Sequence, residues 1–426
     1  MAGLCGWQAV LSDARRSLEY YGDRALAVPL TEFMEGGFTV KTLIKNASVY
    51  HNHRFEALDL LLEDGRISRM GGCEGERCDE VIDAGGKRVV PGVVDIHTHG
   101  AVGVDVNGAD ADGFEKICRF FASQGTTSWL CSVLTDTKEQ TMYAIRMYKE
   151  WKNTEHRGAN LMGIHLEGPF LCPAYKGAMP EHLLKKPDME LLKAYQEAAG
   201  GEVLYITVSP EVEGIVDFIP YIKSLGIQVA IGHSGADYDT ARRAIQNGAL
   251  GATHTGNAMK LLHQHFPAIW GAVLEDDEVY CEMICDGRHL HPGTVRFIIK
   301  IKGLDRVIAV TDSIMAAGLP DGNYKLGVNN VVVVDGDAKL SSDGTRAGST
   351  LTSGKALKNL LEFTGRSLED IVPLLTENPA RLIGVYDRIG SIEPGKDADL
   401  VFLDWDYEIV RTMVKGKVCH ERKLHT

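Results

Sequence analysis

The chain lacks several features that would assign it to a particular class of protein. Its 426 residues contain no apolar run as long as the roughly 20 residues that a membrane-spanning helix needs. The first 30 residues lack a basic segment followed by an apolar one, so a secretory signal peptide is not expected. The nine cysteines form no CxxC pair and are odd in number, which favours free thiols over disulfides. We therefore expect a cytoplasmic protein.

Positive charge is also in short supply. The chain has 45 Lys and Arg against 58 Asp and Glu, a formal net charge of −13. Nucleic acids and anionic membranes are bound through basic surfaces, so neither is an expected partner. A small anionic substrate held by a few local groups is compatible with this balance. Because 44% of the residues are hydrophobic, the chain can form a sizeable core.

Regular structure is expected to begin at Val40. Residues 1–39 are interpreted as a leader of unclear role: EGGFTV at 35–40 can be encoded as a ribosome-binding sequence followed by a GTG start codon, so one hypothesis is that the natural protein lacks this leader. Residues 40–88 contain strand-like segments separated by Asp-Gly and Gly-Gly turns, and similar segments occur in 386–426. We predict that these two segments form one small β-sandwich domain built from both chain ends.

Short apolar runs alternate with amphipathic stretches between these two parts, over residues 89–385. The expected strands are 89–97, 127–135, 161–168, 203–211, 228–234, 251–257, 279–287 and 306–313. The expected helices between them are 113–125, 139–151, 190–199, 215–226, 238–248 and 294–303. Continuously apolar strands are typical of a parallel sheet covered on both faces, and eight such units predict an α/β fold, the (β/α)₈ TIM barrel. Residues 321–350 interrupt the alternation and are expected to form hairpins, followed by closing helices at 356–365 and 368–385.

Imidazole and carboxylate side chains stand at the ends of five expected strands. They are His97, His99, His165, Glu167, His233, His254 and Asp312. In a barrel of this kind the strand ends meet at one face, where active sites form. His97 and His99 would point to the same side of a strand, but alone they fit histidines bonded to backbone as well as a metal site. The other strand ends favour the metal site.

The residue types at these ends indicate the chemistry. Glu167 ends a buried run, where an unpaired charge is costly and a metal ion would be its partner. Glu167, His233 and His254 form a His₂Glu set, which leaves a position open for water at a catalytic ion. Asp312 either caps the next helix or shuttles a proton beside that water, and its place on strand eight favours the second role. His165 is a core histidine or a neighbour of the ligands.

These positions resemble the amidohydrolase superfamily. Many of its members carry a carboxylated lysine on strand four, but no lysine ends that strand here, and Glu167 on strand three is available instead. This exchange, together with HLEGPF, KGA, GHS, THxxNAM, DGxH, VTD and NPARLIG, resembles the N-acetylglucosamine-6-phosphate deacetylases over about residues 41–426. The resemblance implies a metal-dependent hydrolase that removes acetate from N-acetylglucosamine 6-phosphate in amino-sugar metabolism, and it implies a homodimer.

The resemblance also implies roles for individual residues. Glu167, His233 and His254 would bind one divalent ion, and His97 and His99 a second ion that Glu167 bridges. Asp312 would be the catalytic aspartate. Ala178, Asn257, Ala258, His289, Arg346, Ala347 and Gly348 match positions that contact the sugar or its phosphate. Ligands without thiolate favour Zn²⁺, although Fe²⁺, Mn²⁺ and Co²⁺ accept the same set.

Two positions depart from the family's pattern. Family members hold the substrate phosphate with an arginine contributed across a dimer interface, and His265 stands at that position here. Histidine is a weaker, pH-dependent phosphate partner, which Arg288 or His263 could support. Met179 stands where some one-metal members use a histidine to polarise the carbonyl, a role that a second ion could take over.

Three alternatives to this function stay open. The substrate could be N-acetylgalactosamine 6-phosphate, or the chain could be another amidohydrolase that acts on an N-acyl or cyclic amide. The third alternative is a barrel without catalysis that serves as a scaffold. Such a protein should have lost some of the five proposed metal ligands or Asp312, and none of these six residues is missing.

Overall fold

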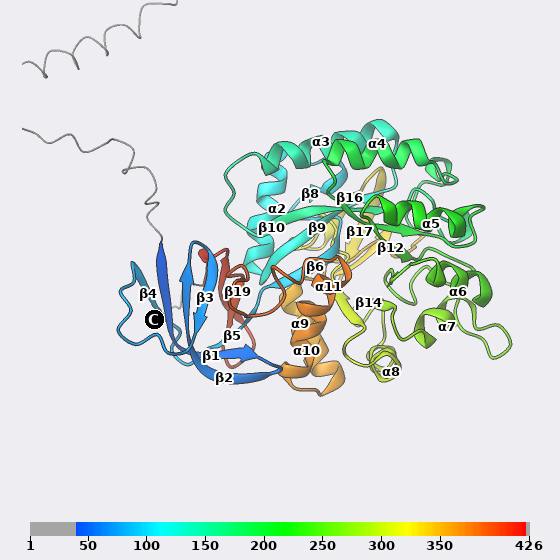
Figure 1. Cartoon of the computed structure of the whole chain (residues 1–426). Helices are drawn as coiled ribbons and strands as arrows, with labels where there is room; N and C mark the ends of the chain where they lie inside the picture. Colours follow the sequence, from blue (N-terminus) through cyan, green and yellow to red (C-terminus); the bar gives the residue numbers. More distant parts are fainter. Residues whose placement is uncertain (1–39, 423–426) are drawn as a thin grey trace, which may run out of the picture. The chain divides into compact units, whose positions relative to one another are not determined.

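Eight parallel strands form the centre of the structure, a computed structural model that describes residues 40–422 (Figure 1). They are β6 (Val93–Thr98), β9 (Thr126–Leu134), β10 (Asn160–Glu167), β11 (Val203–Val208), β12 (Gln228–Ile231), β13 (Gly251–Ala252), β14 (Tyr280–Ile284) and β15 (Val307–Val310). Each strand pairs with the next one along the chain. The first and last strands are joined just beyond β15, where Asp312 N donates to His97 O at 2.9 Å and His99 N to Ser313 O at 2.7 Å. The predicted (β/α)₈ barrel is confirmed.

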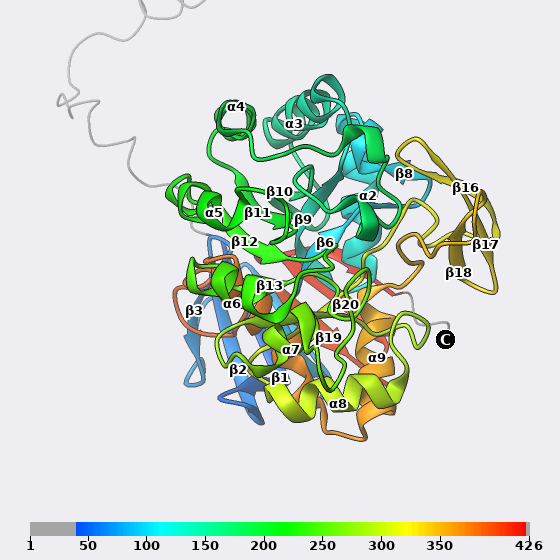
Figure 2. The ribbon, with the colours of Figure 1, turned by 90° about the vertical axis from the view of Figure 1, so that its right-hand side faces the viewer.

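Helices pack around the strands and supply the outer layer of the barrel (Figures 1 and 2). They are α2 (Ala111–Ser123), α3 (Lys138–Lys152), α4 (Met189–Ala199), α5 (Ile215–Ser224), α6 (Tyr238–Gln246), α7 (Ala268–Glu275), α8 (Pro292–Lys302), α9 (Ser353–Thr364), α10 (Leu368–Leu375) and α11 (Glu377–Leu382). In α2, Asp110 caps the first turn by accepting from Gly113 N, and Phe114, Ile117 and Phe121 face the core. Each such side chain contributes about 1.5–3 kcal/mol by its burial.

The predicted helices are present, together with one helix that was not predicted. Helix α7 has the sequence AIWGAVLE, and six of its eight residues are buried. A helix that is apolar nearly all round has no polar face, so the periodicity that reveals the other helices is absent. The single closing helix expected at 368–385 is two helices, α10 and α11, which meet at Thr376.

The strand expected at 89–97 is wrong as a single element. It is two strands in two sheets: β5 (Arg88–Pro91) pairs with strands from the chain ends, whereas β6 belongs to the barrel. The chain changes sheets at Gly92, where a Cβ atom would lie 1.9 Å from Thr127 Oγ1. Only glycine lets the backbone pass this close to β9.

Both ends of the described chain build one small β domain, as predicted. Its strands are β1 (Lys41–His51), β2 (Arg54–Glu63), β3 (Arg66–Met70), β4 (Glu80–Asp83), β5, β19 (Leu400–Leu403), β20 (Ile409–Val414) and β21 (Lys417–Glu421). They run in the order β21-β20-β19-β5-β1-β2-β3, and β4 pairs with β1. These strands enclose a core of their own, which includes Leu60, Ile67 and Phe402. In Figure 1 the blue and red strands lie side by side.

The hairpins expected within 321–350 form a three-stranded antiparallel sheet of β16 (Gly322–Leu326), β17 (Asn329–Val334) and β18 (Asp337–Leu340), drawn in yellow in Figure 2. Its apolar side packs with Leu134, Leu171 and Met179 next to the carboxyl ends of the barrel strands. A short hairpin, β7 (Gly100–Ala101) and β8 (Val104–Asp105), follows β6 at the same end. These insertions bring the residues after β18 to the mouth of the barrel.

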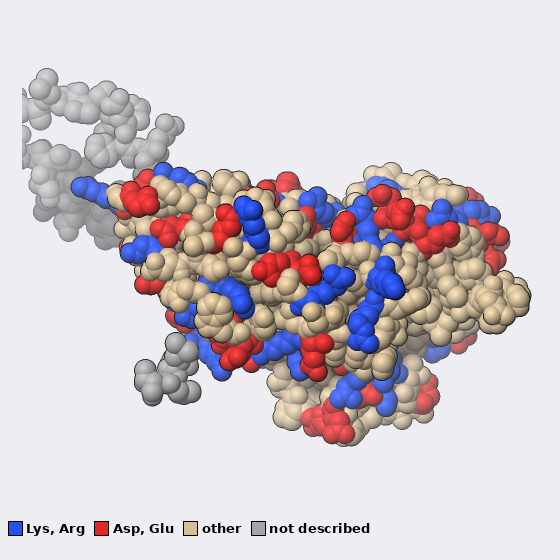
Figure 3. Space-filling view, turned by 90° about the horizontal axis from the view of Figure 1, so that it is seen from below, with Lys and Arg blue, Asp and Glu red and all other residues tan. Residues whose placement is uncertain are grey.

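None of the helices in residues 40–422 is long and apolar enough to cross a membrane. On the face seen in Figure 3, lysine and arginine lie interspersed with aspartate and glutamate. The eight cysteines between Val40 and Arg422 are free thiols, in agreement with the expectation from their spacing.

Candidate metal centre

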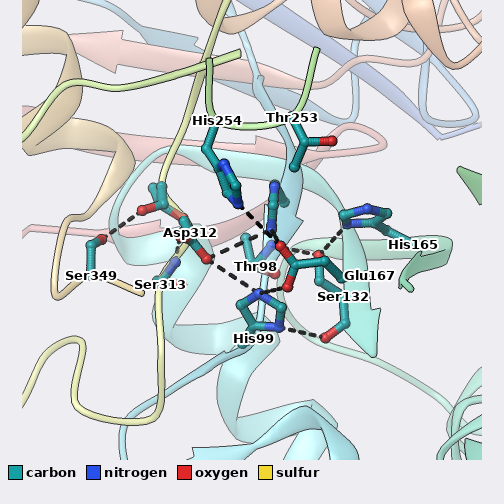
Figure 4. Close-up of polar contacts among 12 residues, drawn as sticks. Thr98, His99, Ser132, His165, Glu167, Thr253, His254, Asp312, Ser313 and Ser349 are labelled. Atoms are coloured by element: carbon teal, nitrogen blue, oxygen red, sulfur yellow. Dashed lines mark hydrogen bonds and ion pairs between the residues drawn. The ribbon is translucent and has the colours of Figure 1, made fainter. Parts of the chain in front are cut away.

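The structure brings together the residues that the sequence predicted as metal ligands. Each lies at or just beyond the carboxyl end of a barrel strand, and all are at least nine-tenths buried. Figure 4 shows His254, Glu167, His99 and Asp312 pointing toward one another. The backbone is strained at three of these positions, since φ is +48° at His233, +28° at His254 and +49° at Asp312. Residues other than glycine rarely adopt such φ angles. Here these angles direct the side chains of the three residues toward one point.

Glu167, His233 and His254 form the first group of ligand atoms. Glu167 Oε1 lies 3.1 Å from His233 Nε2 and 3.3 Å from His254 Nε2. The two Nε2 atoms are 3.1 Å apart. Ligands about 2.0–2.1 Å from a tetrahedral ion are separated by about 3.3 Å, so these three atoms have the spacing of a Zn²⁺ ligand set.

His97, His99 and Asp312 form the second group. Asp312 Oδ1 lies 3.2 Å from His99 Nε2 and 3.7 Å from His97 Nε2. Glu167 stands between the groups, with Oε1 3.4 Å from His97 Nε2 and Oε2 3.2 Å from His99 Nε2. His97 Nε2 is fully buried and has no hydrogen-bond partner in the described chain. A buried nitrogen without a partner is costly unless it ligates an ion, so the residues present fit a divalent metal.

The orientation of the imidazoles is fixed from behind. His99 Nδ1 donates to the carbonyl of Ser132 at 2.9 Å, and His233 Nδ1 donates to the carbonyl of Tyr175 at 2.8 Å. A ring that donates through Nδ1 presents a lone pair on Nε2, which is the state required of a metal ligand.

The electrostatics of the centre favour positive charge. Burial lowers the pKa of His97, but Glu167 and Asp312 together outweigh it and raise that pKa well above its ordinary value. Burial likewise raises the pKa of Glu167, and the surrounding histidines, His97 foremost, bring it well below its usual range. Without an ion, the carboxylates therefore hold protons on the imidazoles, and metal binding has to displace them.

A cavity of about 460 Å³ opens above the ligands. Of the predicted ligands, His99, Glu167, His233 and His254 reach its wall together with Asp312, whereas His97 lies behind them. Seven of the eight predicted substrate contacts also line it: Ala178, Asn257, Ala258, His289, Arg346, Ala347 and Gly348. Met179 lines it as well. A volume of this size suits a small molecule such as a sugar.

His265 is the predicted contact that the structure does not bring to this cavity. It is exposed on the segment after β13, and neither it nor the suggested supporting residues His263 and Arg288 line the cavity of their own chain. Arg288 instead donates to the carbonyl of Asp335. The role expected of His265 is to bind the phosphate of a substrate held by a second copy of the chain. That role stays a prediction.

Arg346 reaches the cavity in a fixed position. Its Nε donates to Asp337 Oδ1 at 2.9 Å and its Nη2 to Asp337 Oδ2 at 3.1 Å. This pair of bonds lowers the pKa of Asp337 well below its usual range. Lys176, which the sequence analysis did not single out beyond its motif, also lines the cavity and forms no ion pair with any residue in 40–422.

His165 is not a ligand. Its Nδ1 lies 2.8 Å from Ser132 Oγ and its Nε2 lies 2.9 Å from Thr207 Oγ1, so both nitrogens are occupied by hydroxyls inside the barrel. Burial, reinforced by the charge of His97, lowers the pKa of His165 well below its ordinary value and keeps the ring neutral. The ring is buried in the core and also packs edge to face against His97, with ring centroids 4.7 Å apart, so His165 is both a core histidine and a neighbour of a predicted ligand.

Two buried carboxylates beneath the centre, those of Glu282 and Asp95, were not predicted from the sequence. Glu282 contacts His97 Nδ1, and Asp95 Oδ2 accepts from Thr311 Oγ1 at 2.6 Å. Each interrupts the apolar run of a predicted strand, 89–97 for Asp95 and 279–287 for Glu282. The rule that a buried charge needs a partner, which singled out Glu167, could have found them too.

Comparison with known proteins shows the family of the chain. The model of the amidohydrolase family matches residues 88–419. The N-acetylglucosamine-6-phosphate deacetylase of Bacillus subtilis is 37% identical over 333 residues, 78% of this chain and 84% of the relative. The N-acetylgalactosamine-6-phosphate deacetylase of Escherichia coli O157:H7 is 32% identical over 77% of this chain and 86% of the relative. The structure of N-acetyl-D-glucosamine-6-phosphate deacetylase from Mycobacterium smegmatis with its N-acetyl-D-glucosamine-6-phosphate ligand has a TM-score of 0.82 at 29% identity, covering 90% of this chain and 100% of that one.

Proposed function

Because this chain belongs to the amidohydrolase family, we propose that it hydrolyses the acetamide of N-acetylglucosamine 6-phosphate to glucosamine 6-phosphate and acetate. The observation that carries the proposal is the meeting of two buried groups of ligand-type residues, one of which includes Asp312, at one sugar-sized cavity. The deacetylases among the relatives name the substrate class. A barrel that served only as a scaffold would have no reason to keep this strained, buried set of ligands.

We propose that Glu167, His233 and His254 hold one divalent ion and that His97 and His99 hold a second, with Glu167 shared. The spacing of the ligand atoms and the unpartnered His97 Nε2 support this assignment. A bound divalent ion lowers the pKa of water to about 7 and so supplies hydroxide near neutral pH. Zn²⁺ is the proposed metal, because nitrogen and oxygen ligands at this spacing suit it.

Asp312 is proposed as the group that moves the proton. Its carboxylate lines the cavity beside His99, and both His97 and His99 hold its pKa below the ordinary value despite the burial that raises it. An ionised carboxylate there accepts the proton of the attacking water and then delivers it to the nitrogen of the departing sugar amine. Glu167 faces four imidazoles and is not free to exchange a proton in the same way.

The phosphate end of the substrate is proposed to meet Lys176 and His289. Both line the cavity, and Lys176 is the cation there without an acidic partner among the described residues. Arg346 is already bonded to Asp337 and, through Nη1, to the carbonyl of Arg288, so its contribution is a fixed wall of the cavity. The sugar and the acetyl group would contact Ala178, Asn257, Ala258, Ala347 and Gly348. In a homodimer, His265 would contact the phosphate of the substrate bound to the partner chain.

N-acetylgalactosamine 6-phosphate is the second candidate substrate, because a relative that is 32% identical is a deacetylase of that sugar. The two sugars differ at one hydroxyl, so the same ligands would serve both. A homodimer and a cytoplasmic location are further parts of the proposal.

Acetate release tests the function directly. The purified protein would be assayed for acetate release from N-acetylglucosamine and N-acetylgalactosamine, each with and without the 6-phosphate, and from an N-acetyl amino acid. Ring opening of dihydroorotate, which releases no acetate, would be followed separately. We expect a kcat/KM at least tenfold higher for a phosphorylated sugar, as one charge-assisted contact of about 1.5–3 kcal/mol would give. Equal rates with and without phosphate would refute the phosphosugar assignment, and turnover of the amide controls alone would assign another activity.

A further inference from the structure

Glu282 is a carboxylate in the buried interior of the barrel, where a charged group is costly. It is the central residue of β14, its exposure is 0%, and its neighbours Cys281 and Met283 are equally buried. No lysine or arginine of the described chain forms an ion pair with it. Removing an unpaired carboxylate from water costs several kcal/mol, so the contacts of Glu282 have to be worth that penalty.

Both oxygens of Glu282 are used, and two of the three contacts lead to the metal centre. Oε2 lies 3.0 Å from His97 Nδ1 and accepts from the backbone N–H of His254 at 3.1 Å. Oε1 accepts from the Tyr205 hydroxyl at 2.7 Å. Tyr205 reaches it past Gly251, at which a Cβ atom would lie 2.2 Å from the hydroxyl.

These contacts join the two ligand groups. His97 belongs to one group and His254 to the other, and a single carboxylate oxygen bonds to both. Since the carboxylate accepts, His97 Nδ1 donates. Nε2, the buried atom without a hydrogen-bond partner, is then the atom left to present a lone pair once an ion displaces its proton. The other histidines with a bonded Nδ1 donate to neutral carbonyls, so among the described ligands His97 alone is backed by a carboxylate. A carboxylate behind a histidine makes the ring a stronger ligand.

We propose that Glu282 is a positioning residue that sets the occupancy of the second metal site, through the tautomer and basicity of His97. This inference rests on the two-ion centre proposed above and adds what controls its stoichiometry. The first site depends less on Glu282, because its own ligand His254 is contacted only through the backbone. Loss of the charge of Glu282 should therefore empty one site and spare the other.

Metal content measured without substrate tests the proposal independently of the enzyme's activity. Wild-type protein and Glu282→Gln would be dialysed against buffers of graded free Zn²⁺, and bound ions per chain counted by mass spectrometry. The amide can still accept from His97 and His254 and donate to Tyr205, so it removes the charge and keeps the contacts. We expect two ions in the wild type, and in the variant an affinity for the second ion about 10–100-fold lower with the first unchanged.

Tyr205→Phe is the matched control, since it disturbs the far oxygen of Glu282 and should retain both ions. Unchanged second-ion affinity in Glu282→Gln would overturn the proposal, and so would a single ion in the wild type. An equal loss of both ions, with a lower melting temperature of the metal-free protein, would indicate a structural role instead. If Glu282→Gln does not fold, Glu282→Asp keeps the charge but is too short to reach His97 and Tyr205 together, and it should lose the same ion.

Discussion

Replacement of Asp312 by asparagine should separate metal binding from proton transfer. The amide is nearly the same size and keeps an oxygen at the position of Oδ1, which lies 3.2 Å from His99 Nε2. It cannot accept a proton at neutral pH. We therefore expect the metal content to stay close to that of the wild type while kcat falls.

The size of the loss follows from what else surrounds the cavity. Among residues 40–422, only Glu167 and Asp343 offer further carboxylates at its wall, and Glu167 is committed to four imidazoles. Asp343 is exposed at the rim on the segment after β18. With no substitute base, the whole contribution of general acid–base catalysis is lost, about 10²–10⁴-fold in kcat or about 2.7–5.4 kcal/mol in the barrier.

Steady-state acetate release and metal analysis on the same preparations provide the assay. Asp343→Asn is the matched control, because it is the same substitution at the same cavity and should leave kcat close to that of the wild type. An Asp312→Asn variant with full activity would refute the proton-transfer role. A variant that is inactive because it has lost its metal would show instead that Asp312 is needed as a ligand.

Four further outcomes are expected. Lys176→Met should raise KM for a phosphorylated sugar about 10-fold, since one charge-assisted contact of about 1.4 kcal/mol is lost, and leave kinetics with the unphosphorylated sugar unchanged; an equal change for both sugars would exclude a phosphate contact. Removal of metal with a chelator should abolish turnover and lower the melting temperature, and Zn²⁺ at 100 times the Kd of a site should restore about 2.7 kcal/mol of stability for each ion bound. Activity in rigorously metal-free protein would contradict the metal site. Burial raises the pKa of Asp399 from 3.8 to about 7, so the folded protein binds this proton more tightly than the unfolded chain and loses stability as the pH rises from about 4 through 7. Between pH 5 and pH 8, the melting temperature should therefore drop less in Asp399→Asn than in the wild type. Parallel curves of melting temperature against pH for the two proteins would argue against this origin. Gly348→Ala should lower activity, because φ is +58° and the new methyl would lie 2.4 Å from Ile314 Cγ2; wild-type kinetics in this variant would mean that the wall beside Asp312 can yield.

The barrel and most of the candidate site could be predicted from the sequence, because both depend on local patterns. Continuous apolar runs mark buried parallel strands, and residues such as Glu167 and Asp312 stand just where those runs end. The barrel topology then brings the ends together whatever the distance along the chain.

The features that could not be predicted depend on contacts between distant parts of the chain, which leave no local sequence pattern. Helix α7 is buried nearly all round, so it has no period to detect. The boundary at Gly92 is set by the closeness of Thr127, 35 positions later in the chain. Glu282 gains its meaning only from His97 and His254, which lie on other strands. Lys176 is one of many lysines until the cavity is seen around it.

The small β domain has a consequence for how this protein is made. Strand β5 lies between β1, which precedes it closely, and β19, which leaves the ribosome some 300 residues later. Throughout synthesis of the barrel, the edge of β5 that will receive β19 has no partner and offers a template for pairing with another nascent chain. Translation that stops before Leu400 leaves that edge open permanently, so incomplete products should aggregate even when their barrels are whole.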